Sequence, residues 1–237
     1  MFSALLQGLS RQVPSVCRVC RAWPSHPVCE DCVHAFAQPV HRCAVCALAI
    51  PTTLHHCRAC TDTPPVWNAA LAAVDYGYPW DRLIADFKFQ GNPAWARHFA
   101  TVMQSAPWVE PALEAADWVI PMPLARERLL ERGFNQSALL ARHLSPAKVR
   151  EDWLLRLFHT PPQSGLSREE RQHNLQHAFA MEPHCGAHLQ GKNIILVDDV
   201  MTSGATMAAA SVVLQRAGAQ HITALVFART ARGDAGA

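Results

Sequence analysis

The chain has 237 residues, of which 50% are hydrophobic and 17% are charged. This composition excludes global disorder, and the length suits one domain of ordinary size plus a smaller appendage. Lysine and arginine together number 21 against 19 acidic residues, a net charge of +2 that excludes a strongly basic protein wrapping nucleic acid but leaves a local basic patch open. Only Lys88, Lys148 and Lys192 are lysines. The arginine bias hints weakly at a phosphate ligand, because arginine binds phosphate bidentately.

Two features bear on the compartment. The chain contains no uninterrupted apolar run of about 18 residues, so we expect no membrane span. Residues 1–16 lack a basic start and a small-residue cleavage site, so they do not resemble a secretory signal. We therefore expect a cytoplasmic protein whose thiols stay reduced.

Eight of the nine cysteines form four pairs with two residues between the members. This spacing lets one tight turn direct two thiolates at one metal ion, and two such turns complete a four-cysteine zinc shell. The alternative, four disulfides, requires an oxidising compartment. We predict two zinc ions, the first two pairs holding one and the last two the other: Cys17 and Cys20 with Cys29 and Cys32, then Cys43 and Cys46 with Cys57 and Cys60. The remaining cysteine, Cys185, is expected to be a free thiol.

Residues 1–64 contain few large aliphatic side chains, so metal ligation has to supply their folding energy. We predict a double zinc ribbon here, followed after the proline-containing segment 61–65 by a second domain over residues 65–237. A DNA module that reads a groove is normally more basic than this ribbon. A docking or structural role therefore fits the ribbon at least as well as DNA binding.

In the second domain, short apolar runs alternate with segments of helical periodicity. We expect strands over residues 68–76, 118–122, 152–159, 193–197 and 222–227. We expect helices over residues 81–89, 93–105, 125–131, 135–144 and 206–217. The alternation predicts an α/β domain with a mainly parallel sheet flanked by helices. In such a sheet, ligands bind at the carboxyl ends of the strands.

The most informative segment is residues 194–206, in which a buried strand leads to Asp198 and Asp199 and then to a loop of small residues that opens a helix. Small residues allow the backbone to approach a ligand, and free N–H groups at the helix start form a phosphate cradle. Ser203 and Thr206 add hydroxyl groups. Because carboxylates repel phosphate, we expect the two acids to face sugar hydroxyls and a hydrated Mg²⁺.

This segment resembles the motif that binds 5-phosphoribosyl-1-pyrophosphate (PRPP) in type I phosphoribosyltransferases. It is not a Walker A loop, because the Gly-Lys-Ser/Thr ending is absent. The resemblance implies displacement of pyrophosphate from C1 of PRPP, with Mg²⁺ present and with Asp198 and Asp199 as the catalytic acids. It assigns PRPP binding to the loop residues Met201, Thr202, Ser203, Gly204, Ala205 and Thr206.

A longer series of motifs narrows the resemblance to the ComF family of competence proteins, which includes proteins named GntX. The four cysteine pairs are followed in order by LI…FKF (83–89), PMPL (121–124), RGFNQ (132–136) and VDDVMTSGAT (197–206). The resemblance covers nearly the whole chain, from Cys17 to Arg229. It implies a double zinc ribbon before a phosphoribosyltransferase-like fold, and a role in handling single-stranded DNA during natural transformation. Other competence proteins would then be partners.

The resemblance also implies a pyrophosphate site beyond the strand that ends at Pro121, where relatives use backbone amides. Met122 and Pro123 fall at this site. Because proline lacks an N–H group, the candidate donors are the amides of Met122 and of residues from Leu124 onward.

Arginines flank this predicted site. Arg126 and Arg128 begin the next helix and would neutralise phosphate oxygens; the alternative is a solvated helix face shared with neighbouring glutamates. The segment 159–173 is poor in aliphatic residues and suits a lid, from which Arg171 would reach the pyrophosphate. The basic excess in this region predicts weak binding of single-stranded DNA near the PRPP site.

The chain departs from its relatives at Phe158 and His177, beside the expected lid. Thr202 replaces an acid that takes a proton from the nucleobase in some relatives. Lys88 either faces the ligand or lies on the surface, and the sequence supports both alternatives equally.

Three functions remain open at this point. The first is a PRPP-binding protein of the ComF type, the second a metabolic nucleobase phosphoribosyltransferase, and the third a non-enzymatic module that responds to PRPP. Metabolic relatives generally lack zinc ribbons, which counts against the second, and Thr202 slightly favours the third. The sequence leaves the acceptor and the oligomeric state undetermined.

Overall fold

The computed structural model describes residues 15–23, 25–157 and 178–231, and the chain divides into two compact units, Met1–Gln38 and Pro39–Ala237. The first four paired cysteines belong to the smaller unit and the last four to the larger. The domain boundary after residue 64 stays a prediction.

In the smaller unit, an antiparallel bridge joins Ser15 to Ser25, and the helix α2 (Glu30–Phe36) begins directly after Cys29. Glu30 and Asp31 occupy the first turn of this helix, where carboxylates favour the positive end of the helix dipole. The turn carries Cys32, which is buried, so the helix helps to place one predicted metal ligand.

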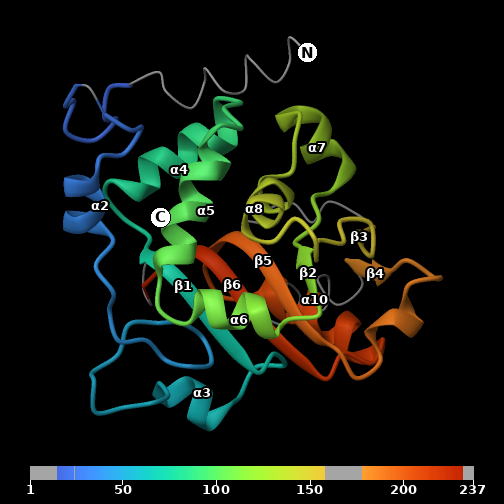
Figure 1. Ribbon diagram of the computed structural model, residues 1–237. Helices are drawn as coiled ribbons and strands as arrows, with labels where there is room; N and C mark the ends of the chain where they lie inside the picture. The colour runs from blue at the N-terminus through green and yellow to red at the C-terminus, as the bar shows by residue number, and fades with distance from the viewer. Residues whose placement is uncertain (1–14, 24, 158–177, 232–237) are drawn as a thin grey trace, which may run out of the picture. The chain divides into compact units, whose positions relative to one another are not determined.

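The larger unit is built on a parallel sheet, as predicted, and this sheet has four strands. Its strand order is β1–β6–β5–β2, with β6 and β5 in the centre (Figure 1). The central strands are almost entirely buried, which explains their continuous apolar sequence. The strands are β1 (Ala69–Asp75), β2 (Trp118–Pro121), β5 (Asn193–Met201) and β6 (His221–Arg229).

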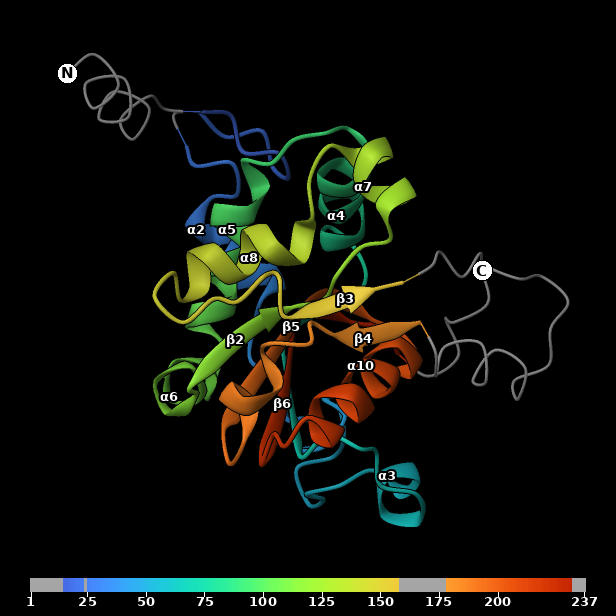
Figure 2. The same ribbon diagram turned by 90° about the vertical axis from the view of Figure 1, so that its right-hand side faces the viewer.

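Helices cover both faces of this sheet. The helices α5 (Trp95–Ser105) and α8 (Gln136–Leu144) lie on one face, and α10 (Ala205–Arg216) lies on the other (Figure 2). The first face carries an aromatic core in which the rings of Phe99 and Phe227 stack with centroids 4.2 Å apart. The other described helices of this unit are α3 (Arg58–Asp62), α4 (Trp80–Phe89), α6 (Val109–Ala115) and α7 (Arg126–Arg132).

A second, two-stranded antiparallel sheet pairs β3 (Leu154–Arg156) with β4 (Phe179–Met181), and β4 contacts α10. A 3₁₀ turn, η1 (Gly186–Leu189), follows β4. The strand predicted over 152–159 is therefore shorter in its described part, and its last two residues lie outside the described residues.

The strand β5 differs from the prediction in one important respect. We expected it to end at Val197, but it continues to Met201, because Asp198, Val200 and Met201 also pair with β6. Both acids therefore lie within β5, near its carboxyl end.

In the part of the chain that the structure describes, no helix is long and apolar enough to cross a membrane.

Candidate functional site

The acid pair, Asp198 and Asp199, is held by contacts from two helices at the carboxyl edge of the sheet. The Ser137 hydroxyl, at the start of α8, donates to Asp198 Oδ1 at 2.9 Å, and the backbone N–H of Asp199 donates to the same oxygen at 2.9 Å. On α4, Lys88 Nζ lies 3.0 Å from Asp199 Oδ1. Lys88 therefore faces the acid pair, and its contact with a ligand stays a prediction.

The acid pair is electrostatically crowded. Burial, followed by the neighbouring charge of Asp199, raises the pKa of Asp198 to about 7, although Lys88, the Ser137 hydroxyl and the Asp199 amide act in the opposite direction. A carboxylate with such a pKa gains or loses its proton near neutral pH. The site thus favours an added positive charge, such as a divalent cation, beside the acids.

The small-residue loop, residues 201–206, runs from the last residue of β5 into the first turn of α10. Gly204 precedes the helix in a left-handed conformation with φ +80°, and a Cβ atom there would lie 3.0 Å from the Trp67 ring. Only glycine adopts this φ angle without backbone strain and leaves the Trp67 ring in its place. Thr202 and Ser203 are exposed, and Ser203 Oγ accepts the Ala205 amide at 3.3 Å. Met201, by contrast, is buried in the core, so only its backbone faces the loop.

The RGFNQ motif, residues 132–136, orders the segments beside the acid pair. Gly133, with φ +78°, ends α7, and Asn135 then caps α8 by accepting the amides of Ser137 and Ala138 at 3.0 and 3.4 Å. The Asn135 side chain also donates to the Met122 carbonyl at 3.0 Å. One side chain therefore fixes both the segment after β2 and the helix that holds Asp198, a role that sequence reasoning missed.

The predicted pyrophosphate donors are not equally available. The Met122 amide donates to the Val197 carbonyl at 2.8 Å, because it continues the bonding between β2 and β5. Its side chain is buried, and Pro123 has no N–H group. The Met122 amide is therefore occupied within the sheet, and the expected pyrophosphate donors from Leu124 onward stay a prediction.

The two helical arginines have different surroundings. Arg126 is exposed and lines a hollow of about 530 Å³ beside the segment after β2. Arg128 lies 3.5 Å from Glu131 one turn along α7, which matches the alternative of a solvated, charged helix face. Arg171 lies outside the described residues, as do the lid segment 159–173 and the departures at positions 158 and 177.

The same hollow is lined by Arg142 and Arg156. Glu151 neutralises Arg142 through two hydrogen bonds, one of them at 2.6 Å to Nη2. Burial lowers the pKa of Arg156, while the charge of Asp198 opposes the shift. The hollow is thus basic, but Glu151 makes its net positive charge smaller than its three arginines alone would give.

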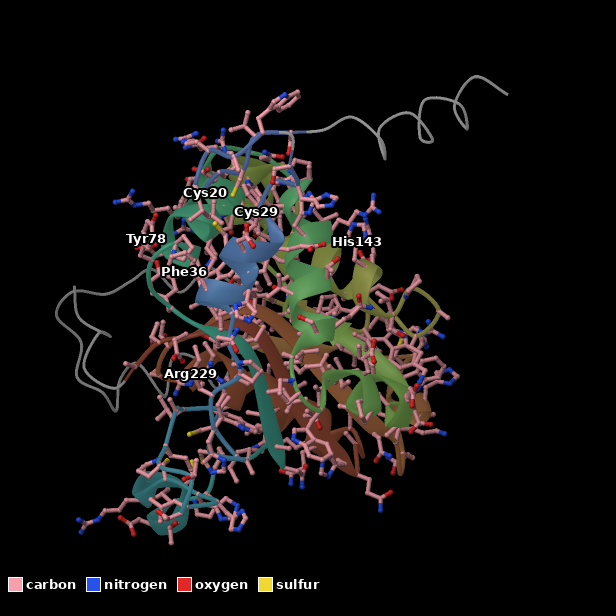
Figure 3. All side chains as sticks on the ribbon, turned by 60° about the vertical axis from the view of Figure 1, so that its left-hand side comes forward. Cys20, Cys29, Phe36, Tyr78, His143 and Arg229 are labelled. Carbon is pink, nitrogen blue, oxygen red and sulfur yellow. The ribbon has the colours of Figure 1, made fainter. Side chains whose placement is uncertain are left out.

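The eight paired cysteines gather into two clusters with the predicted pairing. The first cysteine cluster contains Cys17, Cys20, Cys29 and Cys32, and the second contains Cys43, Cys46, Cys57 and Cys60; within each, all sulfur atoms lie within 4.8 Å of one another. Sulfur–sulfur distances are 3.6 Å for Cys20 and Cys29, labelled in Figure 3, and 3.6 Å for Cys46 and Cys57. A tetrahedron of thiolates ~2.3 Å from zinc has edges of ~3.8 Å, so the donor set fits zinc.

Hydrogen bonds from backbone amides stabilise one cysteine of each cluster in its thiolate form. Burial alone would raise the pKa of Cys17, but N–H groups led by that of Cys20 outweigh it and lower the pKa to about 6. In the second cluster, amides led by that of Cys57 likewise overcome burial and lower the pKa of Cys43 to about 7. Metal ions bind the thiolate form, so these amides favour ligation. Cys185, outside both clusters, is free as predicted and donates to Glu182 at 3.2 Å.

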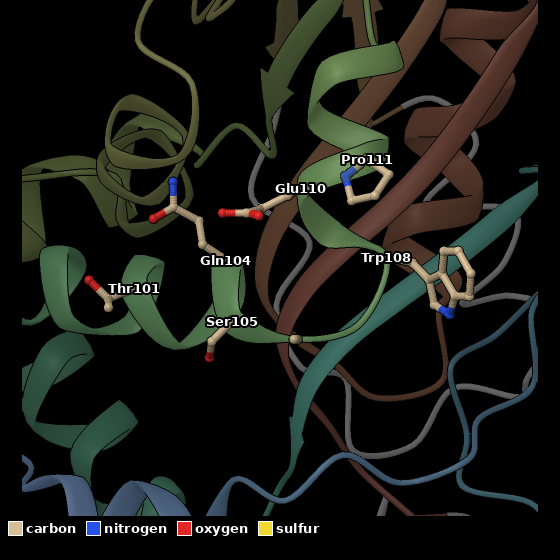
Figure 4. Close-up of a pocket in the computed structure, with 7 residues that line it drawn as sticks. Thr101, Gln104, Ser105, Trp108, Glu110 and Pro111 are labelled. Carbon is tan, nitrogen blue, oxygen red and sulfur yellow. The ribbon is translucent and has the colours of Figure 1, made fainter.

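A further hollow lies where α5 meets α6, lined by Thr101, Gln104, Glu110 and neighbouring residues (Figure 4). The residues that line this hollow include neither Asp198 nor Asp199, so it is separate from the acid pair.

Comparison with known proteins agrees with this geometry. Residues 136–235 match the family model "Phosphoribosyl transferase domain", which spans the acid pair and the small-residue loop. The chain is thus a protein with a phosphoribosyltransferase domain. It is 30% identical to the DNA utilization protein YhgH of Salmonella typhimurium over 92% of this chain and 98% of the relative. It is 31% identical to Competence protein F of Haemophilus influenzae over 79% of this chain and 84% of that protein. The chain belongs to the ComF family.

A solved structure described as the allosteric regulatory enzyme of purine biosynthesis is also similar. The TM-score is 0.35 at 17% identity, and the likeness covers 55% of this chain and 25% of the other. That likeness is too low to add to the family assignment.

Proposed function

We propose that this protein binds PRPP with Mg²⁺ at the carboxyl edge of its sheet, and that it uses this site in the uptake and use of DNA in the cytoplasm. The observation that carries the proposal is the junction of the acid pair with the small-residue loop at the start of α10. The names of the relatives, a DNA utilization protein and a competence protein, support the biological context.

In this proposal each part of the site meets a different part of PRPP. The amides and hydroxyls of Thr202, Ser203 and Thr206 hold the 5-phosphate at the helix start. Asp198 and Asp199 accept the ribose hydroxyls and the water ligands of Mg²⁺. The Mg²⁺ ion would balance charge on the pyrophosphate when PRPP is bound. Lys88 neutralises Asp199 while the ligand is absent.

Two zinc ions, one in each cysteine cluster, complete the proposed holoprotein. Their role is structural, because four cysteines leave no open position on a tetrahedral ion.

Among the possible activities, the site favours binding of PRPP without rapid turnover. Some relatives have an acid at the position of Thr202 that takes a proton from the nucleobase, and a threonine hydroxyl does not accept a proton at neutral pH. Release of pyrophosphate on mixing the protein with PRPP, Mg²⁺ and candidate bases would instead favour the alternative of a metabolic transferase.

Single-stranded DNA is the proposed second ligand, held weakly by phosphate contacts to Arg126, Arg128 and the basic hollow beside them. The ion pair between Arg142 and Glu151 limits the number of contacts, so we expect low affinity and no base readout.

The test of PRPP binding is titration calorimetry on the zinc-loaded protein. Changing Asp198→Asn together with Asp199→Asn should weaken binding at least ~100-fold, since each charged hydrogen bond contributes ~1.5–3 kcal/mol. The matched control is Asp117→Asn, which removes an acid at the amino end of the same sheet, where Asp117 bonds Lys192 and the Asn193 amide. Unchanged affinity in the folded double variant would refute the site assignment.

A further inference from the structure

Arg229, the last residue of β6, connects the second cysteine cluster to the small-residue loop. It lies opposite Met201 in the pairing of β6 with β5, and it is 6% exposed. Its Nε donates to the Cys46 carbonyl at 2.8 Å, and its Nη1 donates to the Met201 carbonyl at 2.8 Å and to the Thr202 carbonyl. Figure 3 shows Arg229 beside the loop that carries this cluster. One buried guanidinium thus bonds a metal-ligand residue and the first two residues of the loop.

Trp67 makes a second connection between the same two structures. Its indole N–H donates to the Val45 carbonyl at 2.5 Å, inside the turn from Cys43 to Cys46. The far edge of its ring lies against Gly204, 3.0 Å from where a Cβ atom would stand. The ring therefore sets how closely the small-residue loop approaches the cluster, independently of Arg229.

The turn from Cys43 to Cys46 is itself attached to the sheet. The Ala70 amide, in β1, donates to the Ala44 carbonyl at 2.9 Å. Arg42 donates to the Ala47 carbonyl at 3.1 Å and to Asp75 at 2.6 Å. An ion bound by Cys43 and Cys46 would fix the two carbonyls, of Val45 and Cys46, that receive Trp67 and Arg229.

We propose that metal binding at the second cysteine cluster positions the small-residue loop for its phosphate ligand, with Arg229 and Trp67 as the positioning residues. This inference rests on the proposed binding of PRPP at the loop. It makes the second cluster a control element of the ligand site: loss of its ion by chelation or thiol oxidation lowers PRPP affinity. We expect loss of the ion of the first cysteine cluster to leave the loop unchanged, because Arg229 and Trp67 bond the turn of the second cluster.

The chain supplies a matched pair of variants for the test. Cys57→Ser with Cys60→Ser removes half of the second ligand set but leaves the turn from Cys43 to Cys46 unchanged. Cys29→Ser with Cys32→Ser does the same to the first cluster. Each double variant should lose one zinc ion per chain.

The first readout is hydrogen–deuterium exchange of the peptide covering residues 200–206, measured without PRPP. We expect exchange about tenfold faster or more in the Cys57/Cys60 variant, as for loss of one or two hydrogen bonds of a charged group, and wild-type exchange in the Cys29/Cys32 variant. The second readout is calorimetry with PRPP and Mg²⁺, in which affinity should fall about tenfold or more only in the Cys57/Cys60 variant.

Two substitutions keep the test decisive if the Cys57/Cys60 variant does not fold. Arg229→Lys retains the charge but cannot bond all the carbonyls, and Trp67→Phe removes only the donor to Val45 and part of the ring. Both should keep two zinc ions and still speed exchange of the loop. Wild-type exchange in both, or equal effects of the two cysteine variants, would overturn the inference. If exchange responds as expected but wild-type protein binds no PRPP, the connection stands and the proposed function fails.

Discussion

Lys88 provides a sharp test of the electrostatics at the acid pair. We consider Lys88→Gln, which removes the cation 3.0 Å from Asp199 and keeps a polar side chain of similar length. The Asp199 carboxylate is 9% exposed, so water replaces the lost charge poorly. We expect the folded state to lose stability wherever both acids are ionised.

The magnitude follows from the geometry. Coulomb's law at 3.0 Å with an effective dielectric constant of ~20 gives ~5 kcal/mol. Desolvation of the ammonium group, whose side chain keeps 21% exposure, reduces the expected loss in the free energy of unfolding to ~2–3 kcal/mol. The matched control is Lys192→Gln, which breaks an ion pair of 2.9 Å to Asp117 with side chains 43% and 32% exposed. That loss should be much smaller, because solvent screens the pair.

The effect has a definite pH dependence. The pKa of Asp198 is raised above its unfolded value, so this group costs stability as pH rises through about 7. Lys88 lowers that pKa, so removing Lys88 enlarges the cost at pH 8 and leaves it small below the unfolded pKa, near pH 4. Urea unfolding at pH 5 and pH 8 measures this, and Mg²⁺ should restore part of the loss at pH 8. An equal cost for Lys88→Gln and Lys192→Gln at pH 8 would refute the reasoning.

Elemental analysis should find two zinc ions per chain, one after Cys43→Ser and still two after Cys185→Ser; a wild-type value of one would contradict the paired clusters. Affinity for PRPP with Mg²⁺ should rise about tenfold from pH 6 to pH 8, because Asp198 loses its proton over this range. The variant Asp198→Asn should flatten that pH profile. A variant with the wild-type pH dependence would show that another group loses the proton. Anisotropy of labelled single-stranded DNA should show a log–log salt slope of roughly −2 to −3 that Arg126→Gln with Arg128→Gln makes shallower; absence of binding at low salt would exclude the DNA surface.

The parts of the fold that follow local rules were predictable. The runs at β5 and β6 are continuous and apolar, as buried parallel strands require, and the cysteine spacing alone led to both clusters. Glycines at the ends of the predicted helices also carried information, since Gly133 ends α7 in a left-handed conformation.

The parts that depend on how elements pack were not predictable from one sequence. Lys88 faces Asp199 only because α4 lies against the carboxyl edge with that side inward, and a short helix pattern does not determine its rotation. The Met122 amide is occupied because β2 and β5 pair in a particular register. Arg229 ends an apolar run and carries no local pattern, so only the structure revealed its contact with Cys46. Short elements such as α6 and β4 were missed because they have too few residues to show a period.

Titration of the zinc-loaded protein with PRPP, in the presence of Mg²⁺ and again with Mg²⁺ chelated, tests the central claim most directly. The acid pair beside the small-residue loop predicts one PRPP bound per chain with Mg²⁺ and a large loss of affinity without it. Absence of binding under both conditions, or equal affinity with and without Mg²⁺, would contradict the assignment of Asp198 and Asp199 to a metal-bound ribose ligand.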